Sequence, residues 1–220
     1  VHGSVDFTRS FAKSCNTSYA NIGLSLDRNE FGDTLNQLLF NQKLPVSFQH
    51  SVSNLVVAEN TPDADMMQIS IGQGAAGITP LQLNMITCAI ANDGNLMKPY
   101  LVDSVKNSAG TITKEVKPSA YGELMTETEA AAMQTLMEAV VTEGTASRLK
   151  GLSYTAAGKT GSAEYGTVKG ESHAWFTGYA PAENPQICVT IIIEGAGAGG
   201  DYAVPIAKRI FDAYLTEPQS

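Results

Sequence analysis

The sequence of 220 residues predicts a single domain of the α+β class, with an antiparallel sheet flanked by helices. Apolar residues recur at helical spacing in several segments between residues 6 and 144. After Thr155 the pattern changes to three strand-like runs joined by short links, which favours antiparallel neighbours. No repeat, low-complexity tract or linker divides residues 1–220, so we expect one domain.

Composition restricts the possible partners. Apolar residues make up 43% of the chain and charged residues 16%, which is typical of a globular protein. The formal net charge is -8 and no cluster of Lys and Arg occurs, which argues against nucleic acid as a partner. The longest apolar run, residues 187–193, is too short to span a bilayer. The chain begins at Val1, so we expect a piece of a longer protein whose anchor lies elsewhere.

The cysteines and histidines predict neither a metal site nor a cofactor. Cys15, Cys88 and Cys188 lie far apart, and the three His are isolated, so the close spacing of a zinc site is missing. An odd number of cysteines gives no disulfide framework from sequence, and it leaves the redox compartment open.

The first 65 residues predict three helices and a loop. Asp6 can cap a first helix that carries Phe7 and Phe11 and runs into the turn Ser14-Cys15-Asn16. Helical spacing continues through a second and a third segment, marked by Tyr19, Ile22, Leu26, Phe31, Leu35, Leu38 and Leu39. Residues 44–65 are rich in Pro, Asn and Ser and predict a loop.

A glycine-rich stretch resembles a dinucleotide-binding motif, but the position of the helix that follows does not fit one. Gly72, Gly74 and Gly77 form Gly-x-Gly-x-x-Gly after the strand-like run 67–71. In a dinucleotide fold the third glycine lies inside the helix that follows. Here the helix signals, Thr79 as N-cap and Pro80 as first residue, come after all three glycines, so we reject this alternative.

The middle of the chain predicts two helices around a hairpin. One helix runs from Pro80 to a stop at Gly94. Residues 96–105 and 111–116 predict a β-hairpin with its turn at 107–110. Thr126 and Glu129 form a capping box that opens a helix ending at Gly144.

The last third predicts the sheet. The strands are residues 154–165, 172–179 and 187–194, and residues 195–200 form a glycine linker. A final helix over 204–215 should bury four side chains against the sheet, namely Ile206, Ile210, Phe211 and Tyr214.

The first of these strands carries the chemistry. Lys159 supplies a positive charge, Thr160 and Ser162 supply hydroxyl donors, and Gly161 lets a substrate approach the strand edge. These groups can hold a carboxylate. The triplet Lys-Thr-Gly arises often by chance, so it needs a second element, and Ser14-x-Asn16 provides one.

With these two motifs the chain resembles the class B (monofunctional) penicillin-binding proteins, within the serine β-lactamase and transpeptidase superfamily. The resemblance extends over nearly all 220 residues. It rests on these stretches: His2-Gly3, Ser14-Cys15-Asn16-Thr17, Gly72-Gln73-Gly74, Thr79-Pro80-Leu81-Gln82, Ala91-Asn92-Asp93-Gly94, Glu143-Gly144-Thr145, the Lys-Thr-Gly stretch and residues 173–181.

This family uses three motifs, Ser-x-x-Lys with the nucleophile, Ser-x-Asn and Lys-Thr-Gly. The resemblance places the first some tens of residues before Ser14, outside this chain, so we expect the piece to be catalytically incomplete. Ser10-Phe11-Ala12-Lys13 fits Ser-x-x-Lys as text. We interpret Ser10 and Lys13 as parts of the first helix, because five consecutive residues cannot enclose a substrate carbonyl.

The resemblance implies acyl transfer in peptidoglycan cross-linking, with stem peptides and β-lactams as ligands. Ser14 would relay a proton, Asn16 would hold the substrate amide, and Lys159 would provide positive potential. Thr160 and Ser162 would bind a carboxylate, Gly161 would keep the strand edge open, and the Ser162 N–H would form half of the oxyanion hole.

The implied location is the extracytoplasmic face of the bacterial membrane, with a wall-synthesis glycosyltransferase or divisome proteins as further partners. Two alternatives stay open: a β-lactam sensor or β-lactamase of the same superfamily, and a non-catalytic scaffold of a wall-synthesis complex.

Overall fold

A computed structural model describes residues 2–165 and 171–216 of the chain. Its main sheet has the order β5-β6-β7, formed by β5 (Ala157–Glu164), β6 (Ser172–Ala180) and β7 (Ile187–Ile193). Both pairs are antiparallel, as the short links predicted. Lys159 pairs with Thr177 and Gly161 with Trp175, so the chemistry-bearing strand is an edge of the sheet.

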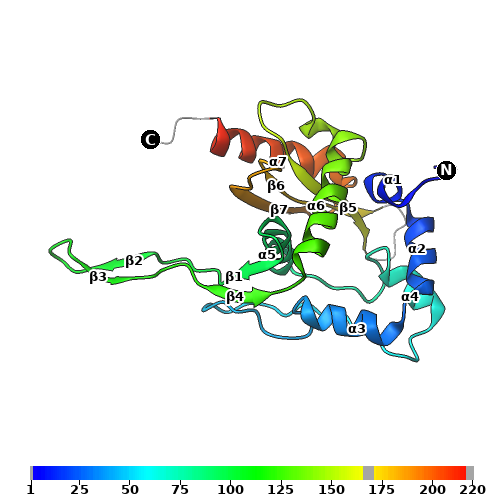
Figure 1. The fold of residues 1–220 in the computed structure, drawn as a ribbon, viewed down its shortest axis with the longest axis horizontal. Helices are drawn as coiled ribbons and strands as arrows, with labels where there is room; N and C mark the ends of the chain where they lie inside the picture. Colours follow the sequence, from blue (N-terminus) through cyan, green and yellow to red (C-terminus); the bar gives the residue numbers. More distant parts are fainter. Residues whose placement is uncertain (1, 166–170, 217–220) are drawn as a thin grey trace.

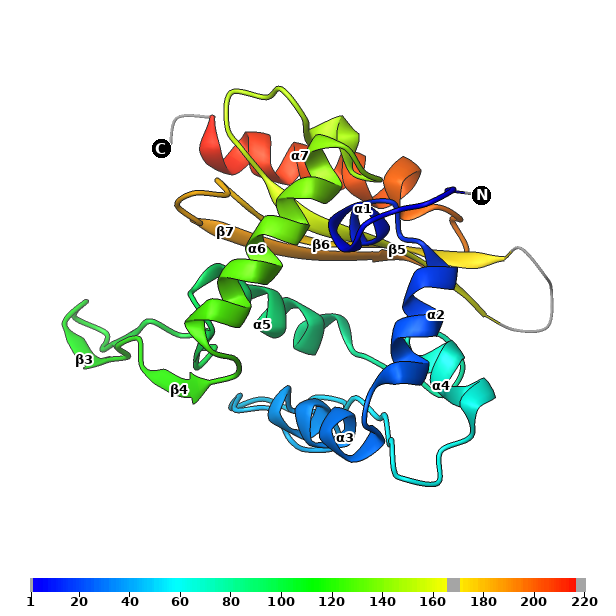
Figure 2. The same cartoon turned by 45° about the vertical axis from the view of Figure 1, so that its right-hand side comes forward.

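Helices cover both faces of this sheet, which confirms the predicted architecture (Figure 2). α7 (Gly199–Leu215) lies on one face and α5 (Pro80–Ala91) on the other, while α6 (Glu127–Thr142) packs against β5. The core under α7 contains fully buried side chains from α6, the sheet and α7, among them Val140, Phe176, Val204 and Phe211.

The predicted buried face of the last helix is wrong except for Phe211. Ile206, Ile210 and Tyr214 are 37–44% exposed, and the buried residues are Gly199, Ala203, Val204, Ala207 and Phe211. The helix also starts at Gly199, inside the predicted linker. A Cβ on Gly199 would lie 2.2 Å from the Trp175 carbonyl oxygen, so the helix end sits directly on the sheet. Because the helix lies so close to the sheet, the helix face with the small residues Ala203 and Ala207 packs against it, and the face with Ile206 and Ile210 does not.

Three short helices form the N-terminal part, as predicted: α1 (Phe7–Ala12), α2 (Asn16–Ser25) and α3 (Arg28–Gln37). The Asp6 carboxylate caps α1 by accepting from the Arg9 N–H at 2.7 Å. The Asp27 carboxylate caps α3 through the N–H groups of Asn29 and Glu30. α1 and α2 meet at Ser14, so the turn between them carries the Ser-x-Asn motif.

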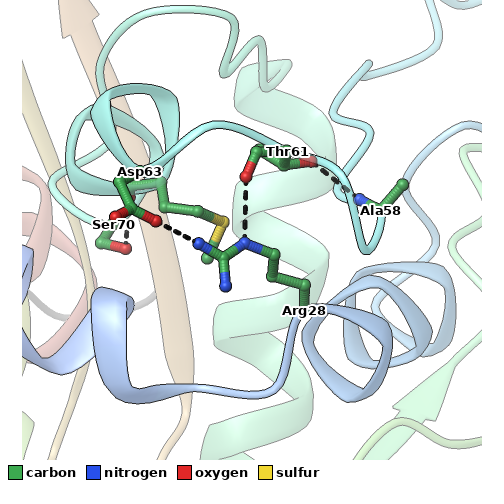
Figure 3. Close-up of polar contacts among 6 residues, drawn as sticks. Arg28, Ala58, Thr61, Asp63 and Ser70 are labelled. Atoms are coloured by element: carbon green, nitrogen blue, oxygen red, sulfur yellow. Dashed lines mark hydrogen bonds and ion pairs between the residues drawn. The ribbon is translucent and has the colours of Figure 1, made fainter.

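One helix was missed. α4 (Asp63–Ile69) occupies residues that were assigned to a loop and to a strand-like run. Asp63 and Asp65 lie in its first turn, where carboxylates favour helix formation. Figure 3 shows Arg28 holding this segment, with its guanidinium donating to Asp63 and to the Thr61 carbonyl oxygen. Because a helix and not a strand precedes Gly72, the strand-glycine-helix geometry of a dinucleotide site is missing here.

The segment that was predicted to form one hairpin instead forms two separate antiparallel strand pairs. β1 (Asn95–Met97) pairs with β4 (Ala120–Glu123), and β2 (Ser104–Lys106) pairs with β3 (Ile112–Glu115) around the predicted turn. The β2–β3 ribbon extends away from the body (Figure 1), whereas β1 packs against α5 and buries Leu96. In the part of the chain that the structure describes, no helix is both long and apolar enough to cross a membrane.

Candidate active site

A cleft of about 870 Å³ collects the predicted site. All six predicted residues line it: Ser14, Asn16, Lys159, Thr160, Gly161 and Ser162. They come from the turn before α2, the first residue of α2 and the edge strand β5, and Ser14 and Lys159 are 145 residues apart in the sequence.

The central contact joins the two motifs. The Lys159 ammonium donates to the Ser14 hydroxyl at 2.9 Å and to the Thr160 carbonyl oxygen at 2.8 Å. Ser14 has a φ of 53°, in the left-handed region that non-glycine residues seldom adopt. Strained residues of this kind persist only where surrounding contacts hold them, and they cluster at functional sites.

The end of α6 holds the turn in place. The Thr145 N–H donates to the Ala12 carbonyl oxygen at 3.2 Å, and the Lys13 ammonium donates to the Glu143 carbonyl oxygen. A Cβ on Gly144 would lie 2.2 Å from the Ala12 carbonyl oxygen. The glycine after α6 therefore lets the chain of α1 approach closely enough to present Ser14 to Lys159.

We expect Gly144→Ala to destabilise the fold by about 2–3 kcal/mol, since the added methyl group must displace backbone. Gly122→Ala is the matched control, because a Cβ at Gly122 meets no atom within 4 Å. Urea unfolding of both variants checks this. Equal stability of the two variants would show that α1 is not held at this point.

Burial controls the charge of Lys159. Its ammonium lies 5.7 Å from the centre of the Phe11 ring. Desolvation by burial lowers the pKa of Lys159 to about 8, because the charged form loses hydration. A lysine with a pKa near neutrality can exchange a proton with a neighbouring hydroxyl during a reaction.

This shift predicts a dependence of stability on pH. Between pH 8 and the ordinary lysine value of 10.5, the unfolded chain keeps the Lys159 proton and the folded chain loses it. The free energy of unfolding therefore rises with pH in this window. Relative to Lys159→Met, the wild-type chain should gain stability from pH 8 to 10, measured by urea unfolding. A difference that stays constant with pH would contradict the lowered pKa.

The strand that carries Lys159 also brings hydroxyl groups to the cleft. The side-chain hydroxyls of Thr160 and Thr145 hydrogen-bond to each other. The Ser162 hydroxyl accepts from the Gly199 N–H at 3.3 Å. The positive end of the α7 dipole is thus aimed at Ser162, which favours an anion in the cleft.

Two stretches fit Ser-x-x-Lys as text, and neither has the required geometry. Ser10 is only 2% exposed, and its hydroxyl donates to the Phe7 carbonyl oxygen of the same helix at 2.7 Å. Its hydroxyl is therefore buried and already bonded within α1. Ser147 lines the cleft, but the Lys150 ammonium donates to the Thr142 carbonyl oxygen at 3.0 Å. Neither serine has its lysine as a base.

Comparison with known proteins identifies the family to which the chain belongs. Residues 1–212 match the penicillin binding protein transpeptidase domain. The chain belongs to this transpeptidase family. The match confirms the family and the fold that the motifs predicted.

Among relatives of this transpeptidase domain, PbpA of Mycolicibacterium smegmatis, a peptidoglycan D,D-transpeptidase, is 31% identical over 97% of the chain. MrdA of Haemophilus influenzae, also a peptidoglycan D,D-transpeptidase, is 26% identical over 98%. The chain spans 45% and 37% of these relatives' lengths.

Solved structures of the family have the same fold. A D,D-transpeptidase domain from Eggerthella lenta superposes with a TM-score of 0.87 at 26% identity, over 98% of the chain and 55% of its own length. Penicillin-binding protein A of M. tuberculosis, as an acyl-enzyme with ceftriaxone, gives 0.87 at 27% identity, over 96% and 49%.

Several residues of the transpeptidase cleft escaped the sequence assignment. Thr145 belongs to a stretch that carried the family resemblance, but its contact with Thr160 could not be anticipated. Gln73, from the glycine-rich stretch, donates to the Ser162 carbonyl oxygen at 3.5 Å. Arg148 and Asp201 form an ion pair at 3.2 Å beside the cleft, and no sequence motif marks either of them.

A second cavity, of about 620 Å³, lies against the same strand. It shares Lys159, Thr160, Gly161 and Ser162 with the cleft, and it is otherwise lined mostly by apolar side chains, including Ile86, Ile90, Met133 and Met137. Lys159 thus lies between a polar cleft and an apolar cavity.

Proposed function

We propose that the protein containing this chain is a D,D-transpeptidase that cross-links peptidoglycan by serine acyl transfer. The observation that carries this proposal is the contact at 2.9 Å between the Lys159 ammonium and the Ser14 hydroxyl, in a cleft that the hydroxyl-bearing residues Thr160 and Ser162 also line. The family membership and the relatives named as D,D-transpeptidases support the same reaction class.

In this reaction a serine oxygen attacks the carbonyl carbon of the penultimate D-alanine. The C–N bond to the terminal D-alanine breaks, and the leaving nitrogen takes a proton that Ser14 relays. An amine of a second stem peptide then attacks the acyl-enzyme, forms the cross-link and releases the serine. Covalent catalysis replaces one difficult step by two easier ones.

Each residue of the cleft has a role in this proposal. Lys159 lowers the cost of deprotonating Ser14 and attracts the substrate carboxylate. Thr160 and Ser162 donate to that carboxylate, and Asn16 holds the substrate amide. Gly161 leaves the strand edge open. The Ser162 N–H forms half of the oxyanion hole, where one donor is typically worth about 3 kcal/mol in the transition state.

The nucleophile would come from a segment outside these 220 residues. Ser10 and Ser147 lack a lysine base, and the shared apolar cavity offers a place for such a segment beside Lys159. A helix with one apolar face could fill this cavity while presenting a serine to the cleft.

The proposed ligands are peptidoglycan stem peptides and β-lactams, since a solved relative, penicillin-binding protein A of M. tuberculosis, forms acyl-enzymes with two different β-lactams. The proposed location is the extracytoplasmic face of the membrane, where such stem peptides are found. A glycosyltransferase or divisome partner is part of the same proposal. The alternatives are a β-lactamase and a scaffold, which the experiment below separates, and a β-lactam sensor, which release of D-alanine from a D-Ala-D-Ala peptide by the longer chain would exclude.

The test is the intact mass of the protein after incubation with excess penicillin G. We expect no adduct on residues 1–220 alone and one penicilloyl adduct on a longer chain that includes the upstream residues. An adduct that persists for hours supports the transpeptidase, and rapid loss of the adduct with hydrolysed drug would indicate a β-lactamase. A longer chain without any adduct would favour the scaffold. An adduct on residues 1–220 would contradict the external nucleophile.

A further inference from the structure

The structure brings together two cysteines that are remote in the sequence. Cys88 lies on α5 and Cys188 on β7, and α5 packs against β7. The Cys88 thiol donates to the Asn84 side-chain oxygen at 3.6 Å, and each thiol is close enough to the other to shift its pKa. Both cysteines are partly buried and reduced.

Neighbouring contacts fix the register of this pair. The Asn84 amide donates to the Thr190 hydroxyl at 3.3 Å, one helical turn from Cys88 and two strand residues from Cys188. One turn of helix advances about 6 Å and two strand residues about 7 Å, so these steps match. Residues two apart on a strand share a face, which places Cys188 beside Thr190 toward α5.

A second hydrogen bond anchors the same helix face. The Thr87 and Thr177 hydroxyls lie 2.6 Å apart, and the Thr177 hydroxyl lies 2.7 Å from that of Thr190. Cys188 is also packed against buried apolar side chains, including Ile90 and Tyr179. Helix and strand are thus held at a fixed separation around the two thiols, which favours a bond between them over a bond to another molecule.

We propose that Cys88 and Cys188 are a redox-active pair that forms a disulfide, bracing α5 against the sheet behind the cleft. The oxidant is a small-molecule disulfide. The Cys88 thiolate attacks one of its sulfur atoms, its S–S bond breaks, and the leaving thiolate takes up the Cys88 proton. Cys188 then loses its proton and attacks the Cys88 sulfur, which forms the internal disulfide and releases a second small thiol.

The pKa values of the two thiols differ in the direction that these two reaction steps require. The hydrogen bond from Cys188 lowers the pKa of the Cys88 thiol, which makes Cys88 the attacking group. The same bond and burial raise the pKa of Cys188. Cys188 therefore acts second, when the mixed disulfide is next to it.

Cys15 provides an internal comparison. The hydrogen bond with His2 lowers the pKa of its thiol to about 7, so Cys15 should also react with a disulfide. It lies at the start of α2, whereas the pair joins α5 and β7. Cys15 should keep the small molecule as a mixed disulfide, whereas the pair should release it.

The test treats the native protein with oxidised glutathione, alkylates the remaining thiols and maps the peptides by mass spectrometry. We expect a peptide linked through Cys88 and Cys188, lighter than its two parts by about 2 Da for the two hydrogens lost. The melting temperature should rise by about 5 °C or more, because the link closes a loop of roughly 100 residues. In Cys188→Ala, Cys88 should retain glutathione.

Several outcomes would overturn the proposal. These are two alkylated cysteines at 88 and 188, glutathione retained on Cys88 in the wild-type protein, or a link through Cys15. A linked protein whose melting temperature is unchanged or lower would contradict a brace that fits the native packing. The wild-type peptide map decides the question even if Cys188→Ala does not fold.

Discussion

Lys159→Met should lower the rate of acylation by penicillin by about 10³-fold in the longer protein that carries the upstream segment. The variant loses the donor that lies 2.9 Å from the Ser14 hydroxyl and the positive charge between cleft and cavity. The measurement is the rate of penicilloyl adduct formation by intact mass, at several drug concentrations.

Lys150→Met is the matched control. Lys150 is exposed, lies near the same cleft, and uses its ammonium to donate to the Thr142 carbonyl oxygen. Its removal should leave acylation within about twofold, since it contacts no proposed site residue. Lys159→Arg separates the two roles of Lys159: drug affinity should largely persist while the acylation step stays slow, because arginine keeps its proton. Normal acylation in Lys159→Met would refute the proposed role.

Ser14→Ala should lower acylation by about 10²-fold or more, because the relay between Lys159 and the leaving nitrogen is lost. The same exchange at Ser10 tests the alternative serine only four residues away. Ser10→Ala removes a buried hydroxyl whose hydrogen bond stays within α1. It should leave acylation unchanged and lower stability by about 1 kcal/mol.

The readouts are adduct formation for function and urea unfolding for stability, applied to both serine variants. A loss of acylation in Ser10→Ala with an unchanged fold would make Ser10 the nucleophile. Unchanged acylation in Ser14→Ala would remove Ser14 from the mechanism.

Local signals in the sequence predicted the fold class, the three strands of the main sheet and the two motifs. The strands β5, β6 and β7 could be recognised because short apolar runs and tight links are local signals. The caps Asp6, Thr79 and Thr126 were read correctly for the same reason, since a cap needs only its own helix.

Local signals failed where a distant contact decides the structure. α4 forms where Arg28, some 35 residues earlier, holds Thr61 and Asp63. The buried face of α7 depends on Gly199 lying against the Trp175 backbone, which favours Ala203 and Ala207 over Ile206 and Ile210. Apolar spacing alone fits both faces of that helix, because each repeats every four residues.

The candidate site also has one part that the sequence predicted and another part that only the tertiary structure shows. Short motifs at Ser14, Asn16 and Lys159 were enough to predict that these residues lie together, and all three line the cleft. The lowered pKa of Lys159, the contact of Thr145 with Thr160 and the pairing of Cys88 with Cys188 belong to the tertiary structure alone. Burial and contact between remote residues create these properties, and a sequence lists residues without saying which of them will meet.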